Sequence, residues 1–186
     1  MKKILTTLIM SSLVVLSATT NKDVKMEAKQ ALMKMGDALK SNMKKNMKAG
    51  GPIQAAHFCT KEAVNIQKEI NKTYRDGLHV KRISLKYRNP NNAPSSDEEK
   101  VLKELQATMD ANKPLPKLLV KKVGKNKYKV YKPLVIKKDV CLTCHGTINI
   151  RSEDAYAIIK SKYPHDKAID YKKGDLRGAF VVEMTK

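Results

Sequence analysis

Residues 118–146, LLVKKVGKNKYKVYKPLVIKKDVCLTCHG, carry the clearest fold signal in the chain. Residues 118–123 and 128–136 are rich in branched and aromatic side chains, and Gly124-Lys125-Asn126 separates them as a turn. This pattern predicts an antiparallel hairpin. The second strand leads without a linker into Cys141-Leu142-Thr143-Cys144-His145.

Two amphipathic helices are predicted before this hairpin. In residues 23–48, and again from Pro52 to Lys72, apolar residues recur at steps of three and four. Gly50-Gly51 ends the first helix, and Pro52 suits the first turn of the second. The first stripe comprises Ala28, Leu32, Met35, Leu39, Met43 and Met47, and the second comprises Ile53, Ala56, Cys59, Ala63, Ile66 and Ile70.

The other elements alternate strands with short helices. We predict a strand over Leu78–Lys86, an irregular loop over Arg88–Pro94, a helix capped by Ser95 or Ser96 that ends at Met109, a helix over 153–162, and a final strand over Gly178–Met184. Two N-terminal helices followed by strands and short flanking helices indicate an α+β fold with an antiparallel sheet.

The N-terminus has the composition of a secretory signal peptide. Lys2 and Lys3 precede an apolar run from Ile4 to Leu16, and small residues follow at 17–20. We therefore predict a signal peptide over residues 1–19, one domain over 20–186, and a periplasmic location. The alternative is an uncleaved anchor, which would bring a membrane into contact with the protein, but the run is short for a span of about 20 residues.

The chain is strongly basic, with 38 Lys and Arg against 18 Asp and Glu and a formal net charge of +20. Such a balance raises the question of nucleic acid. The lysines are scattered rather than clustered, however, and seven Tyr and two Phe offer little to stack on bases. We expect no nucleic-acid partner and interpret the charge as a solvated surface that would steer an acidic redox partner or signalling protein.

Cys141, Cys144 and His145 form the CxxCH pattern of covalent c-type haem attachment. Two thiols separated by two residues can reach the vinyl groups on one porphyrin edge, and the following histidine then lies under the iron. A zinc site would need four ligands, so Cys59 and a distant histidine would have to join the motif. A redox dithiol favours a helix start after a strand in a βαβ unit, whereas Pro133 and a lysine-rich turn precede this motif. In an exported protein the pattern favours one covalent haem c.

The sequence pattern alone does not decide which residue is the second axial ligand of the iron. The candidates are Cys59, His57, His79, His165 and the methionines. Cys59 lies in the apolar stripe of the second helix, and His57 lies about 200° away around that helix. Free cysteines are also common as small buried hydrophobes, so Cys59 has a purely structural alternative.

These residues together resemble the single-haem, PAS-like c-type cytochrome sensor domains first described in cyanobacteria, a family long filed as of unknown function. The resemblance implies a PAS-like fold, in which helices surround an antiparallel sheet, and a haem held between His145 and a cysteine thiolate, here Cys59. It implies redox or diatomic-gas sensing and no enzymatic activity. The matching segments are Cys59 with Ala63, Arg82-x-Ser84, Arg88-Asn89-Pro90-Asn91-Asn92-Ala93-Pro94, Tyr131-Lys132-Pro133-Leu134, Cys141–Gly146, Tyr163-Pro164-x-Asp166-Lys167-Ala168 and Gly174-Asp175-x-Arg177-Gly178.

The chain departs from the family pattern at Ile169-Asp170-Tyr171, where relatives carry a glycine before the aromatic residue. If this position needs a positive φ, Asp tolerates it better than most residues, so we expect only a local change.

Two functions follow from these expectations. In a sensor, the Cys59 thiolate would stabilise ferric iron, leave it on reduction, free the second helix and admit a diatomic gas such as CO or NO. In a small electron-transfer cytochrome c, both ligands would stay in both oxidation states, and the basic surface would dock an acidic partner. A haem peroxidase needs an open site that Cys59 would fill, so we expect no enzyme.

The haem propionates need cationic partners. We predict that Arg82 or Arg88 binds them, because a planar guanidinium can hold a carboxylate through two hydrogen bonds. The alternative for Arg88 is that it ties down its own loop.

Overall fold

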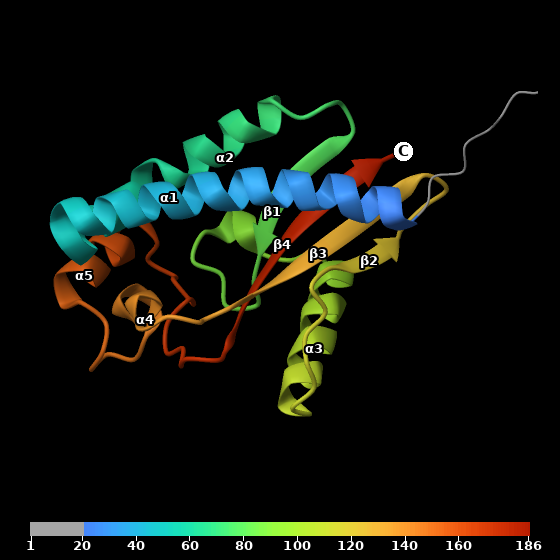
Figure 1. The fold of residues 1–186 in the computed structure, drawn as a ribbon. Coiled ribbons are helices and arrows are strands. Elements are labelled where there is room, and N and C mark those ends of the chain that lie inside the picture. The colour runs from blue at the N-terminus through green and yellow to red at the C-terminus, as the bar shows by residue number, and fades with distance from the viewer. Residues whose placement is uncertain (1–20) are drawn as a thin grey trace, which may run out of the picture.

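The computed structural model describes residues 21–186, and the signal peptide predicted over residues 1–19 lies outside them. The centre of the domain is a four-stranded sheet in the order β1-β4-β3-β2, with every neighbouring pair antiparallel. Figure 1 shows β3 and β4 side by side in its middle. The α+β class with an antiparallel sheet is therefore confirmed. The strands are β1 (Leu78–Ile83), β2 (Leu119–Lys122), β3 (Lys127–Val135) and β4 (Leu176–Thr185).

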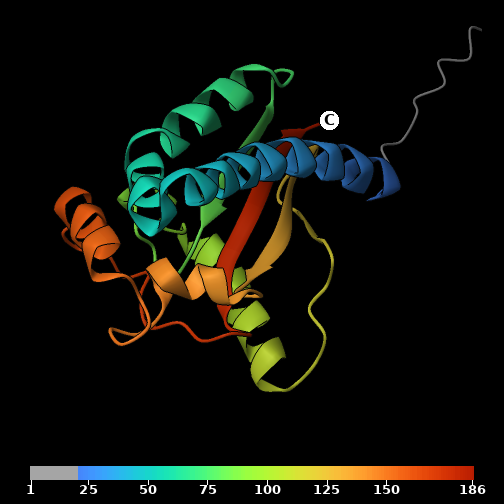
Figure 2. The same cartoon turned by 60° about the vertical axis from the view of Figure 1, so that its left-hand side comes forward.

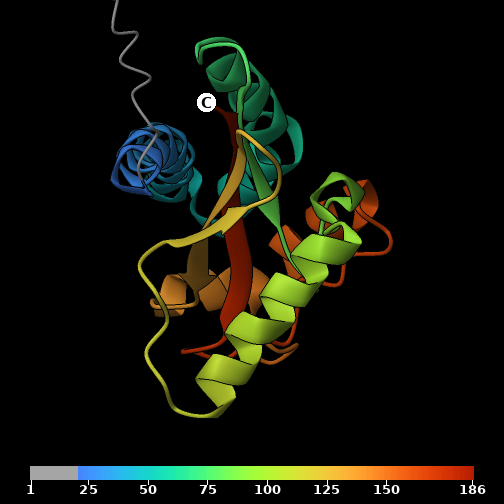
Figure 3. The same ribbon diagram turned by 90° about the vertical axis from the view of Figure 1, so that its right-hand side faces the viewer.

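Helices cover both faces of the sheet. On one face, α1 (Asn21–Lys61) and α2 (Ala63–Lys72) pack against Val80, Val130 and Val182. On the other, α3 (Ser96–Asp110) packs against side chains that include Tyr131 and Val181. Figure 3 shows α1 and α3 on opposite sides of the strands. The shorter elements are η1 (Pro90–Asn92), α4 (Asp139–His145) and α5 (Glu153–Lys162).

α1 consists of two helical limbs joined at Gly50-Gly51, where the sequence predicts the break. Gly51 has a φ of 63°, a conformation that favours glycine, and Gly50 is also non-helical. Figure 2 shows the chain turning back at this point. A one-residue irregularity at Glu62, which no Gly or Pro marks in the sequence, then separates α1 from α2. The stripe of the first limb is buried as predicted for Ala28, Leu32, Met35 and Leu39.

The buried face of the second limb differs from the prediction. Ile53 is 43% exposed, whereas Phe58, outside the predicted stripe, is buried. The reason is that this limb packs on two sides. Phe58 joins the core formed by the first limb, and Ala56 packs against Ala155 and Ile159 of α5. One apolar stripe cannot describe a helix that is covered on two faces.

The first and last strands meet at a glycine. Gly178 of β4 has a φ of 142°, and a Cβ atom there would lie 2.2 Å from the Ile83 carbonyl oxygen, so a larger residue would push β1 away. β1 ends at Ile83, three residues before the predicted end, because the Ser84 N–H donates to the Asn92 carbonyl and its hydroxyl donates to the Arg177 carbonyl. Within residues 21–186, no helix is both long and apolar enough to cross a membrane.

Candidate functional site

The CxxCH motif forms the last five residues of α4, close to the end of β3. The sequence did not predict this helix, because seven residues are too few to show an apolar period. Cys141 and Cys144 are one helical turn apart, so both thiols leave the same side of α4. All three cysteines are free. A helix start after a strand removes one argument against a redox dithiol, but the described strands are all antiparallel and contain no βαβ unit.

The backbone holds His145 in one tautomer. Its Nδ1 lies 2.7 Å from the Ala168 carbonyl oxygen, which can only accept, so Nδ1 carries the proton and Nε2 keeps its lone pair. Burial lowers the pKa of His145 well below its usual value, and the charges of Arg177 and Arg88 act in the same direction. A neutral imidazole whose Nδ1–H bonds a carbonyl is the form in which histidine binds metals.

Arg88 ties the motif to the loop that follows α5. Its Nε donates to the Asp166 carboxylate at 3.0 Å, and its Nη2 donates to the Cys144 carbonyl at 2.8 Å and, more weakly, to the Ala168 carbonyl at 3.4 Å. The Asp166 side chain is fully buried and accepts the Ala168 N–H at 2.8 Å. Arg88 and Asp166 therefore position the carbonyl that orients His145. None of these partners lies in the loop over Arg88–Pro94, so Arg88 links that loop to the motif and to the segment after α5.

Two further arginines line a cavity of about 160 Å³ beside His145, Arg82 from β1 and Arg177 from β4. Arg177 donates to the Ser84 hydroxyl at 2.9 Å and to the Lys86 carbonyl at 3.3 Å. The Nε of Arg82 is buried and has no hydrogen-bond partner. Burial lowers the pKa of both guanidinium groups, which shows how poorly their charges are solvated.

The three arginines outnumber the acidic groups around them. Among the described residues, Asp166 is the only carboxylate that forms an ion pair with any of the three, and its partner is Arg88. Arg82 and Arg177 are thus two partly buried cations without an anionic partner among the described residues. An unpaired buried charge costs several kcal/mol, so this site favours a ligand that brings two negative charges.

Cys59, on the second limb of α1, lies close to the same groups. Burial raises the pKa of its thiol, and the charges of Arg88 and Arg82 oppose that shift. The same two arginines also act on His145. Burial, with a smaller contribution from Cys59, raises the pKa of Cys144. The second limb of α1 and α4 therefore bring Cys59 and the CxxCH motif into one neighbourhood.

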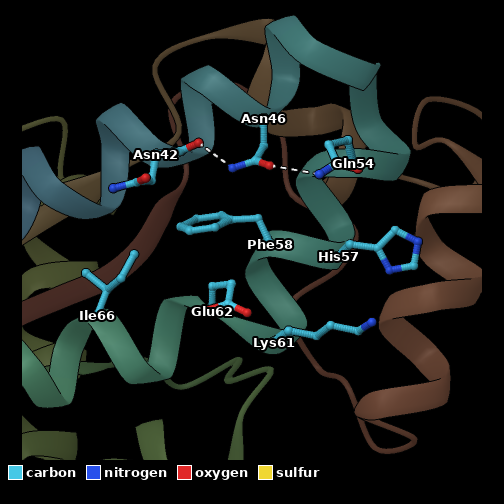
Figure 4. Close-up of a pocket in the computed structure, with 8 residues that line it drawn as sticks. All are labelled: Asn42, Asn46, Gln54, His57, Phe58, Lys61, Glu62 and Ile66. Atoms are coloured by element: carbon cyan, nitrogen blue, oxygen red, sulfur yellow. Dashed lines mark hydrogen bonds between the residues drawn. The ribbon is translucent and has the colours of Figure 1, made fainter.

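The other ligand candidates lie elsewhere. His57 borders a hollow of about 520 Å³ at the kink of α1, and its ring is directed toward α5, whose side chains it meets in a second hollow (Figure 4). His79 and His165 are exposed. The buried Met35 packs in the core beneath α1. Of the candidates named from the sequence, Cys59 is the one beside the motif.

Sequence reasoning missed Arg177, Asp166 and the Ala168 carbonyl as parts of the site. A signal existed, because Arg177 and Asp166 both stand in segments that match the family pattern. Arg177 is also a charged residue in a strand whose neighbours are buried. A cation in such a strand requires a partner, and that requirement could have marked the residue.

Asp170 has a φ of 59°, in the left-handed region, a conformation that Asp tolerates better than most residues. The Asp170 N–H donates to the Gly146 carbonyl at 3.1 Å, and the Tyr171 N–H donates to the His145 carbonyl at 3.0 Å. The loop therefore contacts the end of α4 through two backbone hydrogen bonds.

The fold and the site define a small α+β domain that presents a CxxCH helix beside partly buried arginines. The chain belongs to the Tll0287-like family, which matches residues 18–185. Its structure is similar to the crystal structure of the cyanobacterial heme-protein Tll0287, with a TM-score of 0.65 and 24% sequence identity over 90% of this chain and 98% of that one. No curated protein matches. The PAS-like cytochrome family identified from the sequence is thus confirmed.

Proposed function

We propose that this chain is an exported c-type cytochrome domain with one covalent haem, attached through Cys141 and Cys144 and ligated by His145 and Cys59. The observation that carries the proposal is the state of His145. Its Nδ1–H is bonded to the Ala168 carbonyl, its pKa is lowered, and its Nε2 keeps a lone pair, directly after two cysteines at the attachment spacing. Membership of a family named after a heme-protein supports the same group.

The partly buried arginines fit this group as well. A haem carries two propionates, and Arg82 and Arg177 are two partly buried guanidinium groups without a carboxylate partner within residues 21–186. A planar guanidinium binds a carboxylate through two parallel hydrogen bonds, and the unpartnered Nε of Arg82 is one donor available for this. We assign the propionates to Arg82 and Arg177 and the tether of the motif to Arg88.

The limb of α1 that carries Cys59 adjoins a backbone hinge. It is joined to the first limb only through the non-helical Gly50-Gly51. Phe58 and Ala56 hold this limb against the core and against α5, so any change at Cys59 would reach both contacts.

The haem would supply a one-electron couple, and Cys59 together with His145 would hold its iron. Because burial raises the pKa of the Cys59 thiol, the side chain is neutral when it is not on a metal and then suits its apolar surroundings. Cys59 thus has two acceptable states, on the iron as thiolate or in the core as thiol. This pair of states favours redox or diatomic-gas sensing, with the α1 limb as the responding element.

The covalent attachment is tested on a denaturing gel. The wild-type chain should keep its haem stain after boiling, at one haem per chain, and Cys141→Ala combined with Cys144→Ala should lose it. Haem that extracts from the wild-type protein into acid acetone would refute the attachment.

The axial role of Cys59 is tested by absorption and EPR spectra of the ferric and ferrous protein. Cys59→Ser should keep the covalent haem, lose the low-spin thiolate signature, raise the reduction potential and bind CO without first losing a ligand. His57→Ala, on the same limb but directed toward α5 (Figure 4), is the matched control and should leave the spectra unchanged. A wild-type spectrum and potential in Cys59→Ser would remove the thiolate from the iron.

A small electron-transfer cytochrome is the second candidate, and a lysine-lined groove next to α4 favours it. The two functions differ in ligand exchange. A carrier keeps both axial ligands when it is reduced, so its ferrous form should bind CO slowly or not at all. Rapid CO binding by the wild-type ferrous protein would exclude this candidate.

A further inference from the structure

A surface groove of about 520 Å³ lies between the first limb of α1, the segment 115–118 and the end of β3. Figure 3 shows this segment passing below α1 on its way from α3 to β2. The groove has apolar walls, which Leu115, Leu118, Pro133 and Val135 contribute. A hollow of this size accepts a large apolar side chain or a short segment of another molecule.

Lysines surround these apolar walls. No acidic residue lines the groove, and its four lysines form no ion pair within residues 21–186. They are exposed, and they are Lys29, Lys117, Lys132 and Lys137. On the sheet, by contrast, Lys81 and Lys129 both contact Glu98 and Glu183. The groove therefore presents positive charge that the chain itself does not neutralise.

Exposed methionines continue the apolar surface along α1. Met26 and Met33 lie about one turn before and after Lys29 on the helix, and their exposed fractions are 56% and 49%. Methionine side chains adapt to the shape of a partner, and exposed apolar groups among charged ones are typical of binding surfaces.

The groove adjoins the CxxCH helix. β3 forms one wall and continues into α4, so Lys137 of the groove precedes Cys141 by four residues, which span at most about 14 Å. Ile136, next to Lys137, is buried in the same small cluster as Leu142, and Cys141 packs against that cluster. A molecule seated in the groove is therefore next to the helix that carries the proposed attachment site.

We propose that this lysine-lined groove is the docking site for an acidic redox protein, which seats an apolar side chain between the lysines. The location rests on the groove itself, and the redox character of the partner rests on the proposed function. Charge complementarity selects an acidic protein, and the basic surface of the whole chain would speed its approach. Lysines on an open surface are screened by salt, so the complex should weaken as ionic strength rises.

The test measures binding of a plant-type [2Fe–2S] ferredoxin, a small acidic redox protein, to the haem-loaded chain at low ionic strength. The variant Lys29→Gln, Lys117→Gln, Lys132→Gln should bind the ferredoxin at least tenfold more weakly than the wild type. These side chains are exposed and unpaired within the described residues, so the thermal stability of the domain should stay unchanged.

The matched control removes the same charge elsewhere, through Lys44→Gln, Lys48→Gln, Lys68→Gln. These lysines are also exposed, on the part of α1 before the kink and on α2. The control should bind within threefold of the wild type. Equal losses in the two variants would overturn the proposal, because binding would then follow net charge and need no groove.

Two further measurements separate the remaining explanations. Vesicles of phosphatidylglycerol are tested against the same variants. If vesicle binding requires the groove lysines and the wild type does not bind ferredoxin, the groove binds a membrane surface and the proposal is wrong. Haem content is measured on every sample by the gel stain. A wild-type chain that binds ferredoxin through the groove but carries no haem would refute the proposed function and leave the docking site standing.

Discussion

Replacing Asp166 with Asn tests the tether that orients His145. The side chain of Asp166 is fully buried, and its carboxylate is 3.0 Å from the Arg88 Nε. Asn keeps the volume and an oxygen that can still accept the Ala168 N–H, now 2.8 Å away. The substitution therefore removes the negative charge and also the acceptor for the Arg88 Nε–H, because the Asn amide nitrogen in its place can only donate. It leaves Arg88 without an anionic partner among the described residues.

The expected loss of stability is large. Two unit charges 3.0 Å apart attract by about 5 kcal/mol at an effective dielectric constant of about 20. Removing one partner of a buried pair typically costs about 3–5 kcal/mol, because the other charge stays buried. We expect Asp166→Asn to lower the free energy of unfolding by that amount, which is a large share of the stability of one domain.

Urea denaturation of the haem-loaded protein, followed by far-ultraviolet circular dichroism, measures this loss. The control is Asp139→Asn, which breaks the exposed pair with Lys173 at 3.3 Å and should cost about 1 kcal/mol or less. Adding Arg88→Met to Asp166→Asn removes the stranded cation and should recover part of the loss. Equal losses for Asp166→Asn and Asp139→Asn would refute the reasoning, as would a double variant whose loss is the sum of the two single ones.

Substitutions at four other positions test the scaffold. Interactions with Lys81 and Lys129 outweigh the effect of burial and lower the pKa of Glu98 from 4.5 to about 2. This shift corresponds to about 3 kcal/mol of folding stability. That stability is present above pH 4.5 and is lost as the pH falls toward 2. Glu98→Gln should therefore lower the urea stability by about 3 kcal/mol at pH 7 and by less than half of that at pH 3, and a gap independent of pH would contradict the charge argument. In thermal melts, Gly178→Ala should lower the stability by at least about 2 kcal/mol, because its Cβ would lie 2.2 Å from the Ile83 carbonyl oxygen. Gly36→Ala, where a Cβ would meet open space on α1, should raise the stability by about 0.5–1 kcal/mol in the same assay. At the positive φ of Asp170, Asp170→Ala should be less stable than Asp170→Gly by about 1 kcal/mol, and the reverse order would show that the side chain matters more than the backbone.

Short-range patterns were sufficient to predict most elements. The Gly50-Gly51 break was predicted because it depends on neighbouring residues alone. The helix start at Ser95, where a capping box with Glu98 forms, was predicted to within one residue, because a cap also involves only residues close in the chain. The apolar periodicity gave the wrong buried face where tertiary packing determines burial. The second limb of α1 is covered on two sides, so Ile53 is exposed and Phe58 is buried.

The chemistry of the site divides in the same way. The spacing of Cys141, Cys144 and His145 is a local requirement of covalent attachment, so the motif and its expected cofactor could be predicted from the sequence. The surroundings of His145 could not. Arg88 and Asp166 are 78 residues apart in the chain, and Arg82 and Arg177 come from two strands that meet only through their register in the sheet. Side chains brought together by register have no common period in the sequence, so the tautomer of His145 and the two partly buried, unpaired cations were decided by the tertiary structure alone.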